Sequence, residues 1–378
     1  MIYLDNSATT RPDPSVLEAY VRASQEVFAN PASLHVLGAR AEQLLGQART
    51  QAASFLGVHP EEIVFTSGGT EANNLALFGA AEAYGGRGRH IVVSPIEHPS
   101  VREPIAELRK SGYDVTELPV DRFGRVDPDA VARALTPETM MVSVMAVNNE
   151  LGTVQPLAAI GRTVKAKSRA LFHVDAVQAY AVQEVRPSDW QADLVTLSAH
   201  KWHGPKGVGL LYVRRGVRLL PLFYGGGQEQ GLRPGTVNVP LIAAMARAMR
   251  LTEAARAEAV ARFQRMNAML REAVEAAGGT VLSPDDGAPH ILAAAFPPIR
   301  SETLIHALAE DGVIISTRSA CTSKSGAPSA VLRAVGASDA LSRSAVRISF
   351  GRDNTEAEVE RAGAALIAAV RRLNAVVG

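Results

Sequence analysis

The sequence is poor in cysteine, in aromatic residues and in net charge. Cys321 is the only cysteine among 378 residues, so neither an internal disulfide nor a cysteine-rich metal site can form, and we predict no metal. Aromatic residues make up 5% of the chain and the formal net charge is +1. A chain so nearly neutral has no electrostatic footprint for direct nucleic-acid binding or for a membrane surface. We therefore expect a small-molecule partner.

Long hydrophobic runs are absent as well. No stretch approaches the ~18 apolar residues that a membrane span needs, and residues 1–6 contain no basic leader before an apolar core. These absences predict a cytoplasmic protein. The chain instead has 47% hydrophobic residues with few aromatics, and packing based on alanine, valine and leucine is typical of α/β enzymes. At roughly 150 residues per domain, its length favours two domains.

Strand and helix patterns alternate up to about residue 215. Seven strands are predicted, at residues 62–66, 90–94, 113–116, 140–147, 171–174, 193–197 and 208–213. This order favours an α/β fold with a doubly wound, mostly parallel sheet. A helical region at 241–277 leads to short strands at 290–296, 313–316 and 345–350 and a last helix at 355–375, which predict a small α+β domain.

We place the large domain at residues 15–255. Residues 1–14 and 256–378 form the small domain, in which residues 3–12 are predicted to be an extended arm lying over a surface, because they are small, polar and end in proline. The glycine-rich segment 225–236 is predicted to be a mobile loop at a subunit boundary. Homodimer formation would give this loop a role.

Lys201 follows a short apolar strand, so it is expected just past a strand end, where α/β folds usually bind ligands. A lysine flanked by Ser198, His200 and His203 can bond covalently to a carbonyl cofactor while its neighbours donate to an anion. A solvated basic loop is the simpler interpretation of this stretch taken alone.

Residues 67–74 turn from a strand through two glycines into a helix. Backbone N–H groups at such a helix start favour a phosphate, and Thr70 can add its hydroxyl. No nucleotide-binding motif is matched, so a single phosphate is favoured over a di- or triphosphate. An ordinary glycine turn capped by Thr70 remains the alternative.

Other polar side chains also follow predicted strands. His98 lies in a proline-fixed loop, the position expected for an acid, a base or a ring-stacking group, although a structural histidine is an equal alternative. Asp175 ends a buried strand and could pair with a cationic ring nitrogen, with Gln178 on the same face of the following turn. Asn149 could hydrogen-bond to a ligand ring.

Two further candidates lie near the C-terminus. Cys321 is in a polar, glycine- and proline-broken segment between Arg318 and Lys324, which predicts an exposed thiol with a depressed pKa. Arg347 alternates with apolar neighbours, so its guanidinium points off one strand face, where it could bind a carboxylate. Either residue could instead be structural.

Six motifs together closely resemble the pyridoxal-phosphate-dependent cysteine desulfurases, the NifS/IscS-like group of the class V aminotransferase superfamily. They lie at residues 67–74, 97–99, 148–152, 173–178, 198–201 and 319–323, and the resemblance runs in order from Leu4 to Gly351. It implies the type I fold of pyridoxal-phosphate-dependent transferases, with a seven-stranded sheet in the large domain and a small domain that carries the cysteine loop.

The resemblance also implies roles for individual residues. Lys201 would hold the cofactor aldehyde and move the Cα proton, His98 would stack on the ring and shuttle protons, and Cys321 would be the nucleophile. Cofactor binding is implied for Lys201, Gly69, Thr70, His98, Asn149, Asp175, Gln178, Ser198, His200 and, from a partner subunit, Thr236. Asn149 and Arg347 would bind the substrate carboxylate.

The implied reaction converts L-cysteine to L-alanine and leaves the sulfur on Cys321 as a persulfide. The segment after Cys321 looks like that of the subgroup that passes sulfur to iron–sulfur scaffold proteins or tRNA-thiolation enzymes. The sequence departs from the family pattern at Pro234 and at Thr317-Arg318, and Arg318 could restrict the cysteine loop or change partner docking. The alternatives are a selenocysteine lyase, another aminotransferase-like enzyme of this fold, and an idle scaffold that only binds a sulfur acceptor.

Overall fold

The computed structural model describes residues 1–317 and 329–377. Its main sheet has seven strands in the order β2-β8-β7-β6-β5-β3-β4. Their bounds are β2 Ile63–Thr66, β3 His90–Val93, β4 Asp114–Glu117, β5 Thr139–Ser143, β6 Leu171–Asp175, β7 Leu194–Ser198 and β8 Gly209–Val213. Only β8 runs antiparallel to its neighbours β2 and β7. The prediction of a mostly parallel sheet is confirmed.

Helices cover both faces of this sheet, which explains why its central strands are apolar throughout. Successive side chains of a strand point to opposite faces, so Phe172 and Val174 of β6 pack into one core while Leu171 packs into the other. The first core includes residues of α2 (Val36–Leu56), α6 (Leu157–Lys167) and α8 (Val239–Ala276), and the second includes residues of α3 (Gly69–Tyr84) and α4 (Pro99–Lys110). Shorter helices are α1 (Pro14–Glu26), α5 (Pro128–Ala134) and α7 (Pro187–Trp190).

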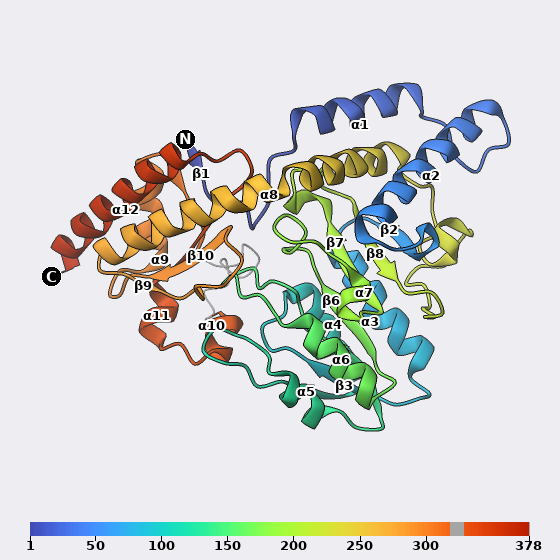
Figure 1. Cartoon of the computed structure of the whole chain (residues 1–378), viewed down its shortest axis with the longest axis horizontal. Coiled ribbons are helices and arrows are strands. Elements are labelled where there is room, and N and C mark those ends of the chain that lie inside the picture. Colours follow the sequence, from blue (N-terminus) through green and yellow to red (C-terminus); the bar gives the residue numbers. More distant parts are fainter. Residues whose placement is uncertain (318–328, 378) are drawn as a thin grey trace.

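A third core lies around a three-stranded antiparallel sheet in the order β12-β10-β9. Its elements are β9 Thr280–Val281, β10 Ile291–Ala295, α9 Ser301–Glu310, α10 Ala330–Ala334, α11 Asp339–Ser344, β12 Ala345–Ser349 and α12 Glu356–Val377. We call the part of the chain around this sheet the small body and the part around the seven-stranded sheet the large body. The 38-residue helix α8 joins the two bodies (Figure 1): Met249 packs in the large core and Phe263 in the small one. The proposed domain boundary after residue 255 therefore falls inside α8, and it remains a proposal.

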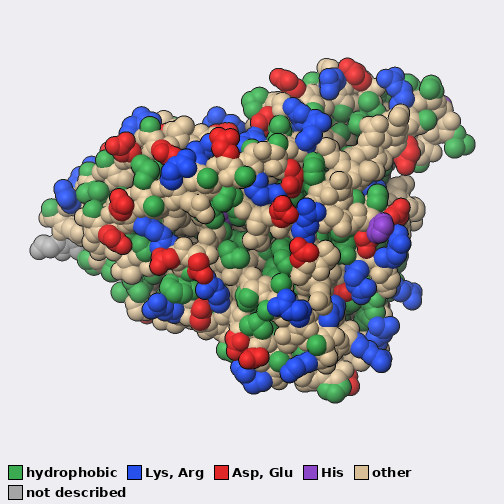
Figure 2. All heavy atoms as spheres, in the orientation of Figure 1, with side chains coloured by type: hydrophobic (Ala, Val, Ile, Leu, Met, Phe, Trp, Pro, Cys, Tyr) green, Lys and Arg blue, Asp and Glu red, His purple; other side chains and the backbone are tan. Residues whose placement is uncertain are grey.

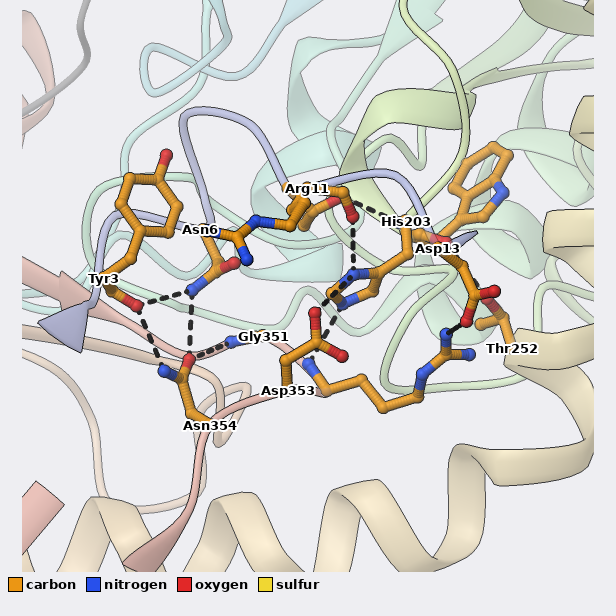
Figure 3. Close-up of polar contacts among 12 residues, drawn as sticks. Tyr3, Asn6, Arg11, Asp13, His203, Thr252, Gly351, Asp353 and Asn354 are labelled. Carbon is orange, nitrogen blue, oxygen red and sulfur yellow. Dashed lines mark hydrogen bonds and ion pairs between the residues drawn. The ribbon is translucent and has the colours of Figure 1, made fainter. Parts of the chain in front are cut away.

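The N-terminal arm is extended, as predicted, but the expectation that it lies over a surface is wrong. Its strand β1 (Ile2–Tyr3) pairs with β11 (Val313–Ile314), and Leu4, Ser7 and Thr10 are buried. The arm runs between the two bodies, and its backbone forms hydrogen bonds to both of them. Figure 3 shows part of this contact region.

On one side of the arm, the N–H of Asn6 donates to the Ser349 carbonyl (3.2 Å), and on the other the N–H of Thr10 donates to the His200 carbonyl (2.9 Å). His203 contacts both the arm and the small body (Figure 3): its Nδ1 lies 2.9 Å from the Arg11 carbonyl, and its Nε2 accepts from the Arg352 N–H at 3.0 Å. The arm is thus fixed between both bodies.

One predicted strand is too long. The apolar run 140–147 leaves the sheet after Ser143, and Val147 instead forms an isolated bridge with Val154. The run stays buried, so its apolar pattern reflects burial rather than strand length. The two-residue strands β1 and β9 were not predicted, because so short a segment shows no periodicity.

No helix in the described part of the chain is long and apolar enough to cross a membrane. On the face shown in Figure 2, acidic and basic side chains are interspersed, in keeping with a net charge of +1. That face carries no extended region of one sign.

Candidate active site

A cavity of about 220 Å³ lies at the carboxyl ends of the parallel strands, the edge where α/β sheets usually bind ligands. It is lined by Ser7, Ala8, Gly69, Thr70, His98, Ser100, Met145, Asn149, Asp175, Val177, Gln178, Ser198, His200, Lys201 and Arg347. Every predicted site residue is among them except Thr236 and Cys321. Thr236 is exposed and away from its own chain's cavity, and Cys321 lies outside the described residues.

Asp175 ends β6 and is 4% exposed. Its Oδ1 accepts from the Val177 N–H (3.0 Å) and its Oδ2 accepts from Nδ2 of Asn73 (2.8 Å), and such donors stabilise a carboxylate anion. Glu97 is buried nearby, where burial and then the charge of Asp175 raise its pKa well above the ordinary value. Burial therefore favours the neutral form of Glu97.

His98 caps the N-terminus of α4, and its Nδ1 accepts from the Ser100 N–H at 3.1 Å. A backbone N–H can only donate, so the neutral ring carries its proton on Nε2, which has no hydrogen-bond partner among the residues that the structure describes. Burial, assisted by Lys201, lowers the pKa of His98. The ring therefore presents an N–H group to its surroundings.

A short hydrogen-bond network joins His98 to Asp175. Nδ2 of Asn73 donates both to Asp175 and to Oγ of Ser100 (each 2.8 Å), and that hydroxyl lies 2.8 Å from Nδ1 of His98. We did not predict roles for Asn73 or Ser100. Asn73 is completely buried, but its neighbours Thr70, Glu71 and Asn74 at the start of α3 are polar as well, so no sequence pattern singled it out.

Lys201 lies in the turn after β7, and its Nζ donates to the carbonyl oxygens of Ser7 and Ala8 in the arm. Nε2 of Gln178 donates to the same Ser7 carbonyl at 2.9 Å. Nδ1 of His200 lies 3.1 Å from Oγ1 of Thr9, and burial together with the charge of Lys201 lowers the pKa of His200 to about 4. His200 is therefore neutral at neutral pH.

The start of α3 lies at another part of the cavity and has the geometry that favours an anion. Gly68 has φ +150°, a conformation that L side chains rarely adopt, and a Cβ on Gly69 would lie 3.0 Å from Cγ2 of Val177. The two glycines thus allow the 16-residue helix to start close against the sheet, where its free N–H groups favour an anion. Thr70 and Ser198 line the cavity beside it.

Arg347 reaches the cavity from β12 of the small body and is 2% exposed. Its Nη1 donates to the Asn149 carbonyl (2.9 Å) and its Nη2 pairs with Oδ1 of Asp5 (2.7 Å). Its Nε is buried and has no hydrogen-bond partner within residues 1–317 and 329–377. The guanidinium therefore keeps capacity for a further acceptor.

Comparisons with known proteins agree with this geometry. The sequence profile "Aminotransferase class-V" matches residues 2–362, so the chain belongs to the class-V aminotransferase family. Within that family it belongs with the cysteine desulfurases of the NifS/IscS type, which are similar to it over nearly its whole length.

The relatives come from several bacteria. A NifS/IcsS protein homolog of Lactobacillus delbrueckii subsp. bulgaricus is 45% identical over 95% of this chain and 94% of its own, and a putative cysteine desulfurase IscS 1 of Bacillus subtilis is 41% identical over 98% and 99%. A solved NifS-like protein has a TM-score of 0.92 at 39% identity over 99% of both chains. These matches confirm the predicted fold and family.

Cysteine desulfurases of this family use pyridoxal 5'-phosphate, and the cavity fits that group. It combines a lysine amine, a buried carboxylate held by two N–H donors, and a glycine-started helix that favours a phosphate. The chemistry of the donor set therefore agrees with the family.

Proposed function

We propose that this chain removes sulfur from L-cysteine, releases L-alanine and holds the sulfur on Cys321 as a persulfide. The observation that carries the proposal is that Lys201, Asp175 and Arg347 line one cavity although they come from different parts of the chain. An amine for an aldehyde, an anion for a ring nitrogen and a cation for a carboxylate are the groups that this reaction needs.

Pyridoxal 5'-phosphate, when bound, withdraws electrons from the substrate Cα and so weakens the Cα–H and Cβ–S bonds. We assign Lys201 to hold its aldehyde, Asp175 to its ring nitrogen and His98 to the ring face. Further cofactor contacts are proposed for Gly69, Thr70, Asn149, Gln178, Ser198 and His200, and from the partner subunit for Thr236. The free N–H groups at the start of α3 support the phosphate assignment.

The substrate is oriented by its carboxylate, for which we propose Arg347 and Asn149. Nζ of Lys201 takes the Cα proton, and we assign His98 to shuttle protons. The Cys321 thiolate attacks the substrate sulfur, so that an S–S bond forms while the Cβ–S bond breaks. The carbon keeps the bonding electrons and takes a proton, which gives alanine and a persulfide.

A homodimer is part of the proposal, and the exposed apolar residues support it. Apart from Met1, Phe223 and Tyr224, every exposed large hydrophobic side chain in the described part of the chain lies between residues 17 and 37. Phe223 and Tyr224 directly precede the loop that carries Thr236. Such clustering marks an interaction surface, and a second copy would cover it.

We further propose that the sulfur acceptor is an iron–sulfur scaffold protein or a tRNA-thiolation enzyme, and that the protein acts in the cytoplasm. The length of the segment after Cys321 supports the acceptor class, because a long segment gives the persulfide reach. A reducing compartment would keep the single thiol available as nucleophile.

The test is incubation of the purified holoenzyme with L-cysteine, followed by measurement of alanine and of the mass of the Cys321 peptide. We expect alanine release and a mass gain of one sulfur. Cys321→Ala should keep the visible cofactor absorbance but stop alanine release, whereas Lys201→Ala should lose both. Undiminished alanine production by Cys321→Ala would remove the nucleophile assignment.

The same assay separates the alternatives. A selenocysteine lyase would act on L-selenocysteine and leave L-cysteine unchanged, while an idle scaffold would show no cofactor absorbance. The similarity to cysteine desulfurases over nearly the full chain favours cysteine as substrate.

A further inference from the structure

The guanidinium proposed to bind the substrate already has an anionic partner within the chain. Asp5 of the N-terminal arm places Oδ1 2.7 Å from Nη2 of Arg347, and the side chains are 18% and 2% exposed. The pair is therefore largely shielded from solvent. Charge–charge interactions in such a buried place are screened less than at the surface.

The main chain of Asp5 is fixed beside β12. Residue 5 forms a parallel bridge with Ser349, two positions after Arg347 on β12, and the hydroxyl of Tyr3 donates to the Asp5 carbonyl at 3.0 Å. These contacts keep the Asp5 side chain within reach of the guanidinium, with which it forms the 2.7 Å ion pair. Burial raises the pKa of Asp5, and the charge of Arg347 opposes that rise.

A ligand carboxylate must share Arg347 with Asp5. Nη1 is bonded to the Asn149 carbonyl and Nη2 to Asp5, while the buried Nε has no partner among the described residues. An incoming carboxylate that uses this remaining capacity comes to lie beside a second carboxylate. Like charges that share one site repel each other, and less water means less screening.

We propose that Asp5 is a positioning residue with two effects: it holds the Arg347 guanidinium in place and lowers the affinity of the site for carboxylates. This inference rests on the proposed role of Arg347 in carboxylate binding. A site weakened in this way releases the carboxylate of alanine readily, because substrate and product carry the same carboxylate.

The experiment compares two competitive inhibitors of the holoenzyme, 3-mercaptopropionate and its neutral counterpart 3-mercapto-1-propanol. Asp5→Asn keeps the shape and the acceptor oxygen for Nη2 but removes the charge. We expect about five- to tenfold tighter binding of 3-mercaptopropionate, no change for the alcohol, and a lower KM for L-cysteine. A residue with a purely structural role would weaken binding instead.

The chain offers a matched control in the same arm. Asp13, labelled in Figure 3, pairs with Arg352 at 2.5 Å, with side chains 22% and 19% exposed. Neither residue is among those that line the cavity. Asp13→Asn therefore removes an arm-to-small-body ion pair without touching the site. It should leave both inhibition constants unchanged.

Weaker or unchanged binding of 3-mercaptopropionate by Asp5→Asn would overturn the inference. If the asparagine variant does not fold, wild type and Asp13→Asn are compared across pH instead, where 3-mercaptopropionate should bind more tightly as Asp5 takes up its proton, with no such change for the alcohol. Arg347→Lys separates the two proposals: if it leaves 3-mercaptopropionate binding intact, the role of Arg347 itself is wrong. If it weakens binding while Asp5→Asn does not tighten it, only the role of Asp5 is wrong.

Discussion

The two sides of the cavity are built differently. One side, the sheet wall, consists of Thr70, His98, Asp175, Ser198 and Lys201, each of which ends or follows a strand of the main sheet. The other, the arm wall, consists of Ser7 and Ala8 from the N-terminal arm and Arg347 from β12, and Asp5 of the arm pairs with that arginine. The sheet wall comes from one body, whereas the arm wall requires both bodies to be in place.

This difference separates two kinds of chemistry. The sheet wall carries the groups proposed for the cofactor, held by backbone and buried side-chain contacts. The arm wall carries the guanidinium proposed for the substrate carboxylate and the carbonyls that accept from the Lys201 amine. Its position depends on contacts such as Asn6 to Ser349 and Thr10 to His200. We expect changes in the sheet wall to affect kcat and changes in the arm wall to affect KM.

The largest effect is expected from Asp175→Asn. The amide lacks the negative charge assigned to the cofactor's ring nitrogen, and it cannot accept from both Asn73 and Val177 with the oxygens that now receive those bonds. We expect kcat for alanine release to fall on the order of a hundredfold or more, the scale of losing one preorganised electrostatic group. KM should change far less, since Asp175 is not among the residues proposed to bind the substrate carboxylate.

Stopped-flow kinetics and cofactor content measured on the same preparation check this prediction. Thermal unfolding of the variant serves as the folding control. A kcat within a few-fold of wild type would show that catalysis does not need this charge. The assignment of kcat effects to the sheet wall would then be wrong.

The second effect is expected from Arg347→Lys. Lysine keeps one positive charge but lacks the planar guanidinium. It therefore cannot donate hydrogen bonds to the Asn149 carbonyl, to Asp5 and to a ligand at the same time in the present geometry. We expect KM for L-cysteine to rise by roughly ten- to a hundredfold with a smaller change in kcat, on the scale of a lost charge-assisted pair. Steady-state kinetics test it, and a loss confined to kcat would contradict the comparison.

The sequence predicted the sheet wall better than the arm wall, for a physical reason. Asp175, His98 and Lys201 follow strands whose apolar runs are visible, and the ends of parallel strands share one edge. Ser7 and Ala8 instead contribute backbone carbonyls, which leave no side-chain signal, to an amine more than 190 positions away.

Partners from distant segments were also missed within the sheet wall. Asn73 bonds to Asp175 across 102 positions, and no local pattern indicates that contact. The prediction for Arg347 shows the limit clearly: alternation indicated an outward guanidinium, but not that Asp5, 342 positions earlier, would already pair with it. Local periodicity predicts faces, whereas pairings depend on the packed fold.

An intermediate effect is expected on the pH dependence of the free energy of unfolding, through His173 in the strands that carry the sheet wall. His173 is fully buried between Ser143 and Thr196, and burial lowers its pKa to about 4 from an ordinary value of 6.5. Between these values the unfolded chain binds more protons than the folded one, so the free energy of unfolding falls as the pH drops from about 6.5 towards about 4. Above that window the stabilisation is fully present. His200 and His290 act in the same direction.

His173→Gln should therefore reduce the pH dependence of stability by up to about one proton. Urea unfolding of wild type and variant at about pH 7 and about pH 5 measures this difference. Equal pH slopes would show that His173 already binds its proton in the folded state.

The smallest effect is expected from Ser100→Ala, which tests whether a single hydrogen bond of the sheet wall contributes to the rate. The variant keeps the backbone N–H that donates to Nδ1 of His98, so the ring retains its proton on Nε2. It loses only the hydroxyl that links His98 to Asn73. A single lost hydrogen bond of this kind corresponds to about 1 kcal/mol, so we expect kcat to fall about fivefold with KM unchanged. Ser100→Thr, which restores a hydroxyl, should recover most of the rate, whereas equal kcat in all three proteins would mean that the backbone cap alone positions His98.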